Sequence, residues 1–209
     1  MTKRTTFRWL IPVILLFLST AAKAQHIELT PFAGGTFAAG INNYSTYYTR
    51  AQIAGSWHWG GALDFYPNKY FSITLSYQEQ PTTASLYGKS GYSTLSAPMH
   101  VSYILVGGNR YFGEDKVQGF GGLGLGMAIL AASGYATADK FAVDLHAGVK
   151  ILASDHVGIR FQIQLDAPVD GGGFGVGVGT GGAAVGVTTY SSIWQFGGNV
   201  GIIFRFGQK

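Results

Sequence analysis

The chain of 209 residues is long enough for one domain, and its lack of cysteine excludes a disulfide framework. Its formal net charge of +4 belongs to residues 1–24, which hold four basic side chains and no acidic one, so residues 25–209 are close to neutral. A neutral chain gives no electrostatic reason to bind nucleic acid. Charged residues make up only 11% of the chain and glycine occurs 32 times, which favours membrane β structure over a soluble enzyme.

The first 24 residues have the layout of a secretory signal peptide. Three basic residues within the first eight positions precede an apolar run over residues 9–18, and Ala22-Lys23-Ala24 follows as a cleavage site. The run is about half of the ~20 residues that a membrane-spanning helix needs. We therefore expect cleavage after Ala24 and one β-barrel domain over residues 25–209.

Residues 25–209 show alternation of polar and apolar positions, interrupted by turn residues, rather than long apolar runs. The predicted strands are residues 26–36, 53–66, 71–78, 99–112, 117–130, 141–151, 157–166 and 192–206. Tight turns are expected at 67–69, 113–116 and 153–156, and longer loops at 37–52, 81–97 and 167–191, with a loop near 133–135 between the fifth and sixth strands. An even number of strands with alternating long and short connections is typical of outer-membrane barrels. The predicted fold class is thus all-β, an eight-stranded antiparallel up-and-down transmembrane barrel.

The phase of the fourth strand is ambiguous because Ile104-Leu105-Val106 is apolar on both faces. We assign Val101, Tyr103, Leu105 and Tyr111 to the outside. In the other strands, the apolar residues fall clearly on one face. In the last strand, for example, Trp194, Phe204 and Phe206 alternate with Gln195 and Arg205.

A soluble barrel with an apolar interior would show the same alternation, so the distribution of aromatic and charged residues decides which face meets lipid. Aromatic residues stand at both ends of the apolar faces, as in the girdles of membrane barrels. The predicted girdle consists of Trp57, Trp59 and Trp194 at the outer edge and Phe65, Tyr111, Phe204 and Phe206 at the inner edge. The apolar faces are therefore expected to meet lipid.

Charged residues on the opposite faces are then expected inside the barrel, in its periplasmic half. They are Glu28, Asp64, Arg110, Lys150, Arg160 and Arg205. Glu28 and Arg205 should meet across the seam between the first and last strands. Buried charges persist only when they are paired and hydrogen-bonded. We expect a network that fills the interior, and a gated ion path is the alternative.

The signal peptide, the eight alternating strands and the ending Val200-Gly201-Ile202-Ile203-Phe204-Arg205-Phe206 resemble the small outer-membrane β-barrel family of the OmpA/OmpX type, in its Bacteroidetes versions. The resemblance implies location in the outer membrane of a Gram-negative cell, contact with outer-membrane lipid and lipopolysaccharide, and reading of the closing strand by the barrel-assembly machinery. Gly207-Gln208-Lys209 depart from the family pattern, because the aromatic residue is not the last one.

The expected function is non-enzymatic: a structural or surface-binding role of a monomer, with an extracellular ligand at its outer loops. Five loop tyrosines could provide contact area for such a ligand: Tyr44, Tyr47, Tyr48, Tyr87 and Tyr92. No cofactor, metal site or catalytic residue is expected, since Asp144 and His146 read as ordinary interior groups. The alternatives are a narrow channel and a lipid-modifying hydrolase, which would need a Ser, a His and an acid in contact near the outer edge.

Overall fold

The computed structural model describes residues 26–42, 48–91, 93–113, 116–134, 137–169 and 194–207, without the side chains of residues 41, 42 and 48. The strands are β1 (His26–Thr36), β2 (Ala39–Asn42), β3 (Tyr48–Ile53), β4 (Ser56–Asn68), β5 (Phe71–Gly88), β6 (Leu95–Gly113), β7 (Val117–Ala132), β8 (Ala138–Leu152), β9 (Val157–Val169) and β10 (Gln195–Phe206). The described part of the chain contains no helix with the length and apolar character needed to cross a membrane. The predicted signal peptide lies outside the described residues.

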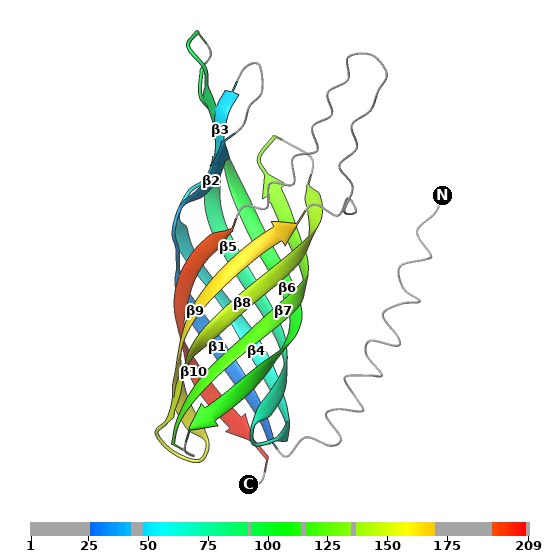
Figure 1. The fold of residues 1–209 in the computed structure, drawn as a ribbon, viewed down its shortest axis with the longest axis vertical. Helices are drawn as coiled ribbons and strands as arrows, with labels where there is room; N and C mark the ends of the chain where they lie inside the picture. Colours follow the sequence, from blue (N-terminus) through cyan, green and yellow to red (C-terminus); the bar gives the residue numbers. More distant parts are fainter. Residues whose placement is uncertain are drawn as a thin grey trace, which may run out of the picture.

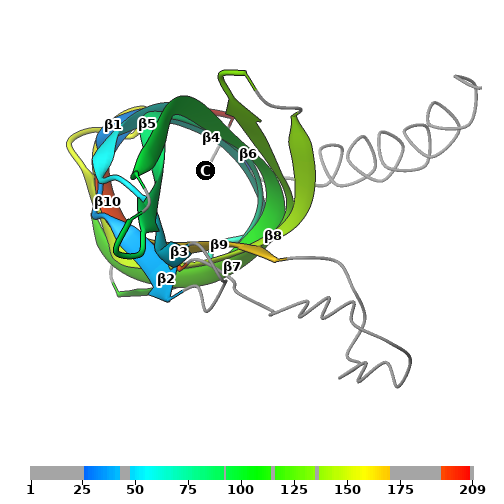
Figure 2. The same cartoon turned by 90° about the horizontal axis from the view of Figure 1, so that it is seen from above.

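Eight of these strands close into a ring. Neighbours pair in the order β5-β4-β1-β10-β9-β8-β7-β6, and β6 pairs back onto β5. Each of these pairings is antiparallel, and Figure 2 shows the closed ring from above. The last strand therefore pairs with the first, which leaves no open sheet edge in the ring. This is the predicted eight-stranded up-and-down barrel.

The two ends of the barrel differ. At one end, called here the short-turn end, brief turns join β4 to β5, β6 to β7 and β8 to β9, and β10 also ends there (Figure 1). At the opposite end, called the long-loop end, β2 and β3 rise beyond the ring as a hairpin. β3 pairs with residues 84–88 of β5, so this hairpin continues the sheet beyond the ring.

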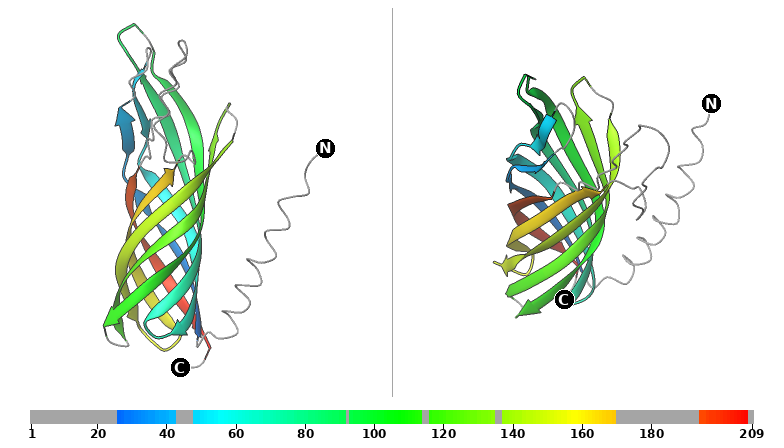
Figure 3. Two further views of the ribbon diagram at one scale, coloured as in Figure 1. Left: turned by 45° about the vertical axis from the view of Figure 1, so that its right-hand side comes forward. Right: turned by 45° about the horizontal axis from the view of Figure 1, so that its top comes forward.

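The loop predicted at 81–97 is wrong over most of its length. β5 runs to Gly88 and β6 begins at Leu95, and the two strands stay in register as far as the pair Leu86 and Leu95. Figure 3 shows them projecting at the long-loop end. The sequence was read as a loop because it is polar, but Thr and Tyr favour strands when a partner strand is available.

Large apolar side chains cover the outside of the barrel. On β7, for example, Leu123, Leu125 and Met127 are each about half exposed, at 52%, 46% and 48%. Charged and amide side chains are buried inside, including Glu28 and Asp64 at 1% or less. This distribution is the reverse of a water-soluble domain and matches a barrel whose outer face contacts lipid.

The phase predicted for the fourth strand is also wrong. Val101 and Leu105 are buried, at 0% and 6% exposure, whereas Ile104 and Val106 face outward at 45% and 39%. Tyr103 and Tyr111 are buried together with the first pair. Because both faces of this strand are apolar, hydrophobic alternation could not select the phase.

Two apolar layers lie inside the barrel. Tyr66, Tyr111 and Phe120 form an aromatic layer toward the short-turn end. A second layer toward the long-loop end consists of Ile53, Met99, Val101, Tyr103, Leu105, Ala128 and Ala142. Between and around them lie the polar residues described below.

Candidate functional site

Glu28 is the centre of the first interior ion cluster. Lys150 Nζ lies 3.1 Å from each of its carboxylate oxygens, and Arg205 donates to Oε1 from Nε at 2.8 Å. The hydroxyl of Tyr66 donates to Oε2 at 2.8 Å. β1 and β10 bring Glu28 and Arg205 together as register partners, as β1 and β4 bring Glu28 and Asp64. A carboxylate in a nearly dry interior is tolerated here because several donors compensate its lost hydration.

Asp64 is the centre of a second cluster one strand away. Arg160 Nη1 donates to its Oδ2 at 3.1 Å. Its other oxygen, Oδ1, accepts from Ser72 Oγ at 3.1 Å, from Asn109 Nδ2 at 3.2 Å and from the hydroxyl of Thr74. Side chains from three other strands, β5, β6 and β9, thus converge on this one carboxylate. Removing any one of them would leave a buried charge or a buried donor without its partner.

Aromatic rings separate these charges from the rest of the interior. Lys150 Nζ lies 4.8 Å from the centre of the Tyr66 ring and 4.6 Å from that of Tyr111. The guanidinium of Arg160 lies 4.2 Å from the centre of the Phe120 ring. Cations over ring faces gain electrostatic stabilisation without water. The aromatic layer and the two clusters together close the barrel toward the short-turn end.

The structure brings together five of the six residues predicted for the interior network. Glu28, Lys150 and Arg205 meet in one cluster, and Asp64 and Arg160 in the other. Arg110 was assigned wrongly, since it is exposed on the outer face of β6, where the shifted phase puts it. Its position near the short-turn end lets its long side chain reach a polar membrane interface.

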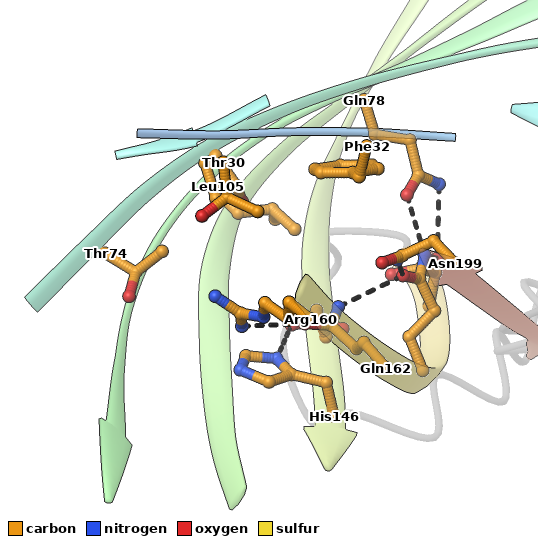
Figure 4. A pocket seen from close by; sticks show the side chains of 14 residues that line it. Thr30, Phe32, Thr74, Gln78, Leu105, His146, Arg160, Gln162 and Asn199 are labelled. Atoms are coloured by element: carbon orange, nitrogen blue, oxygen red, sulfur yellow. Dashed lines mark hydrogen bonds and ion pairs between the residues drawn. The ribbon is translucent and has the colours of Figure 1, made fainter. Parts of the chain in front are cut away.

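Amide side chains continue the polar interior toward the long-loop end. Gln164 Nε2 donates to Gln78 Oε1 at 2.7 Å, and Asn199 Nδ2 donates to Gln164 Oε1 at 2.6 Å. These residues and Asp166 border a small cavity of about 40 Å³, drawn in Figure 4 with Arg160 and His146. A cavity of this size holds a few waters but not a wide aqueous path.

His146, one of the interior histidines, does not form a nucleophilic triad. His146 Nδ1 contacts Asp144, and its Nε2 lies 2.5 Å from Asn109 Oδ1. Both ring nitrogens therefore face oxygen acceptors, and neither is available to take a proton from a hydroxyl. Among the described residues, no group of three or more His, Cys, Asp or Glu side chains could hold a metal ion.

The predicted aromatic girdle is partly present. Trp57, Trp59 and Trp194 are exposed by 46–59%, and Phe204 and Phe206 by 39% and 57%. Two assignments were wrong. Tyr111 is 3% exposed and belongs to the interior aromatic layer, and Phe65 is covered to 8% exposure. The predicted girdle leaves out other exposed aromatic residues, of which Phe71 and Phe112 are at the short-turn edge and Tyr77, Phe141 and Phe196 are nearer the long-loop end.

A separate polar cluster lies on the outer face of β5 and β6. Glu79 accepts hydrogen bonds from Tyr77 Oη at 2.9 Å and from Ser102 Oγ at 2.5 Å, and His100 Nδ1 lies 3.0 Å from its Oε1. Sequence analysis missed this cluster because the wrong phase of β6 turned His100 and Ser102 inward. The sequence offered only a weak local signal, which was two polar residues two positions apart on β6, because Glu79 lay just beyond the predicted strand 71–78 and its register with Ser102 has no local pattern.

Several solved outer-membrane proteins superpose on this barrel. Neisserial surface protein A superposes with a TM-score of 0.55 at 9% identity, over 88% of this chain and 97% of that one. OprG from Pseudomonas aeruginosa gives 0.53 at 11% identity, over 88% and 97%. Ail of Yersinia pestis, solved in complex with the heparin analogue sucrose octasulfate, gives 0.50 at 10% identity, over 86% and 99%. No protein-family model and no curated protein matches this sequence.

The fold is that of the small outer-membrane β-barrels. Neisserial surface protein A and OprG match the barrel over nearly their whole lengths, so the likeness covers the complete ring and not a fragment of sheet. At these identities the likeness concerns the fold alone. The expected Bacteroidetes-type family stays a prediction, and the activity must be argued from the residues of this barrel.

Proposed function

We propose that the protein is an outer-membrane surface barrel with a filled interior, and that its role is carried by its outer parts. The observation that supports this most directly is the pair of interior ion clusters, whose central carboxylates, those of Glu28 and Asp64, are 1% exposed or less. Eight-stranded barrels have interiors just wide enough for side chains to fill. In this proposal the interior is structural and non-enzymatic. Its paired charges stabilise a single arrangement of the strands.

The proposed surface role rests on the projecting ends of β5 and β6. They extend beyond the ring together with the β2–β3 hairpin, and Thr49 Oγ1 donates to the carbonyl of Tyr87 at 3.2 Å. Tyr87 is 40% exposed; Tyr44, Tyr47, Tyr92 and the side chain of Tyr48 lie outside the described residues. Ail, a barrel of similar fold, was solved with a heparin analogue, which supports the idea that such a scaffold can carry a surface ligand.

The proposal includes the expected surroundings of the barrel. The exposed apolar side chains would contact outer-membrane lipid and lipopolysaccharide, and the short-turn end would face the periplasm. The proposal also includes export through the signal peptide and recognition of β10 by the barrel-assembly machinery. The barrel is proposed to be a monomer. The filled interior argues against the narrow channel. The polar cluster on the outer face of β5 and β6 supports the hydrolase alternative.

The filled interior can be tested by electrical recording. Residues 25–209 are refolded, inserted into planar bilayers and compared with the double variant Glu28→Ala/Lys150→Ala, which removes the first ion cluster. We expect no steady conductance from the wild-type barrel and measurable openings from the variant. A stable conductance of the wild-type barrel in symmetrical salt would contradict the filled interior and favour the channel.

The surface role has its own test. Residues 84–97 are replaced by Asn-Gly, which shortens the projecting hairpin and keeps the ring pairs of β5 and β6. The probe is immobilised heparin, chosen because Ail was solved with a heparin analogue. Retention of the full barrel and loss of retention in the shortened barrel support the proposal. Equal behaviour of both barrels argues against a surface role of this hairpin toward polyanions.

A further inference from the structure

The cluster on the outer face of β5 and β6 contains the residue types of an acyl-transfer site. Glu79 holds His100 through Nδ1, so the Nε2 atom of the ring is left without a hydrogen bond among the described residues. Ser102 lies two positions after His100 on the same strand face, with its hydroxyl on the second oxygen of Glu79. An acid that orients a histidine beside a serine is the arrangement that activates a serine nucleophile.

The position of the cluster determines which molecules can reach it. Glu79 is the register partner of Trp59 on one side and of Ser102 on the other, so these outward residues stand side by side across β4, β5 and β6. The rings of Trp59 and Tyr77 pack edge to face with centres 6.2 Å apart. Trp59 is an exposed member of the outer aromatic girdle, so the cluster lies at the level where membrane barrels meet the outer headgroup boundary.

The exposure of the side chains fits access from the membrane. The His100 side chain is 62% exposed, whereas that of Glu79 is 16% exposed beneath its three partners. Ionic groups on the lipid-facing surface of a barrel are unfavourable, and an inert strand would carry apolar residues here. The chain instead places an acid, a histidine and a serine together, next to the apolar outward residues Ile73, Leu75 and Ile104.

We propose that Glu79, His100 and Ser102 form a hydrolytic site for carboxylic esters of outer-leaflet lipids. Ser102 is the nucleophile, His100 the general base and Glu79 the acid that orients the imidazole. An ester bond of a lipid reaches the site by lateral diffusion, because lipid carries its acyl linkages at the headgroup boundary. This inference goes beyond the proposed surface role, and it departs from the non-enzymatic function expected from the sequence.

The reaction proceeds in two balanced steps. Ser102 Oγ attacks the ester carbonyl carbon and its proton passes to His100 Nε2; the bond to the alcohol oxygen then breaks, and the alcohol leaves with that proton. Water next attacks the acyl-serine and gives a proton to His100. The serine oxygen leaves with the proton, so the products are one alcohol and one carboxylic acid, and the side chains are regenerated.

One side-chain rotation is required before the first step. The Ser102 hydroxyl donates to Glu79 and must turn about its Cα–Cβ bond toward Nε2 of His100. Catalytic hydrogen bonds are often completed only when the substrate is bound. Substrate entering beside Trp59 is expected to favour the rotated hydroxyl.

The test uses the refolded barrel in detergent micelles and measures ester cleavage and covalent labelling. An alkyl fluorophosphonate reports an activated serine, and mass spectrometry measures the fatty acid released from lipopolysaccharide or from phosphatidylethanolamine in separate mixed micelles. The variants are Ser102→Ala, His100→Asn and Glu79→Gln. The matched control is Ser96→Ala, because Ser96 is on the same strand face and bonds only to Ser85, at 2.9 Å, among the described residues.

The wild-type barrel and Ser96→Ala are expected to release fatty acid and to be labelled. Ser102→Ala should lose labelling, and each cluster variant should lower the rate by about a hundredfold or more. The lipid that is cleaved identifies the source of the ester. Release from neither lipid, or an unchanged rate in Ser102→Ala, overturns the proposal. Heat-dependent gel mobility of each variant verifies folding, and the conductance and heparin results for the surface barrel stand whatever this outcome is.

Discussion

Arg205 Nη2, on the last strand, lies 2.7 Å from Oε1 of Glu28 on the first strand. The two residues are also register partners, so the ion pair sits directly on the seam that closes the barrel. Lys150 reaches the same carboxylate from β8, across the interior. The side chain of Glu28 on β1 therefore connects β1 and β10, the first and last strands, to β8.

Replacing Glu28 with Ala should destabilise the barrel strongly, because it leaves Lys150 and Arg205 buried without their counter-charge. Breaking a buried ion pair by removing one partner costs about 3–5 kcal/mol of unfolding free energy. Reversible urea unfolding in lipid vesicles measures the loss. The control is Arg110→Gln on the outer face, for which a change within about 0.5 kcal/mol is expected. Similar losses in both variants would argue against the cluster.

The Asp64 and Arg160 pair should show strong coupling. Asp64→Leu alone leaves the buried guanidinium of Arg160 without its counter-charge, and Arg160→Met alone leaves the buried carboxylate of Asp64 without its own. The double variant removes both charges, so its loss of unfolding free energy should be smaller than the sum of the single losses by about 1–3 kcal/mol. A double-mutant cycle in urea measures this. If the losses of unfolding free energy in the two single variants add up to that of the double variant, the ion pair between Asp64 and Arg160 is contradicted.

A glycine of the barrel should resist substitution only where a neighbour is close, as at Gly148 on the inner face of β8 but not at Gly61 on the outer face of β4. A Cβ at Gly148 would collide with the carbonyl of Phe161 and with the Phe120 ring beneath Arg160, whereas at Gly61 its nearest neighbour would be 4.0 Å away. Gly148→Ala should therefore lower stability by about 1–3 kcal/mol, and Gly61→Ala should be nearly neutral. Thermal loss of the folded gel band compares the two. An equal effect of both would contradict the interior packing.

The phase of β6 can be read from single cysteines, since the natural chain has none. A nitroxide attached at Ile104→Cys should be accessible to oxygen dissolved in the lipid. At the adjacent position, Leu105→Cys should react slowly and give an immobile label, because Leu105 is 6% exposed against 45% for Ile104. Electron paramagnetic resonance in vesicles measures both. The reverse pattern would restore the phase expected from the sequence.

Much of the barrel followed from alternation and turn residues, and the aromatic residues at the ends of the apolar faces then indicated that these faces, rather than the face of Lys150, meet lipid. The strand 99–112 could not be phased in this way. Its apolar run satisfies either face, and the inward side is fixed by interior contacts such as those of Asn109 with Asp64 and Thr74. That one error also misplaced Arg110 and Tyr111.

The outward cluster could not be predicted for a related reason. Sequence analysis looked for catalytic groups inside the barrel, around His146, and assigned residues 81–97 to a loop. Pairing of Glu79 with Ser102 depends on the long register of β5 and β6, which no local pattern contains. The interior charges were easier to foresee, because a buried charge needs a partner and few partners were available.

The most direct test of the closed membrane barrel is gel mobility of residues 25–209 refolded into detergent micelles, loaded cold and after boiling, with circular dichroism on the same sample. The account predicts a strand-dominated spectrum and a cold band that shifts to the unfolded position on boiling. A single mobility, from a protein that stays soluble without detergent, would contradict it. The apolar faces would then have to point inward, around the interior of a soluble barrel.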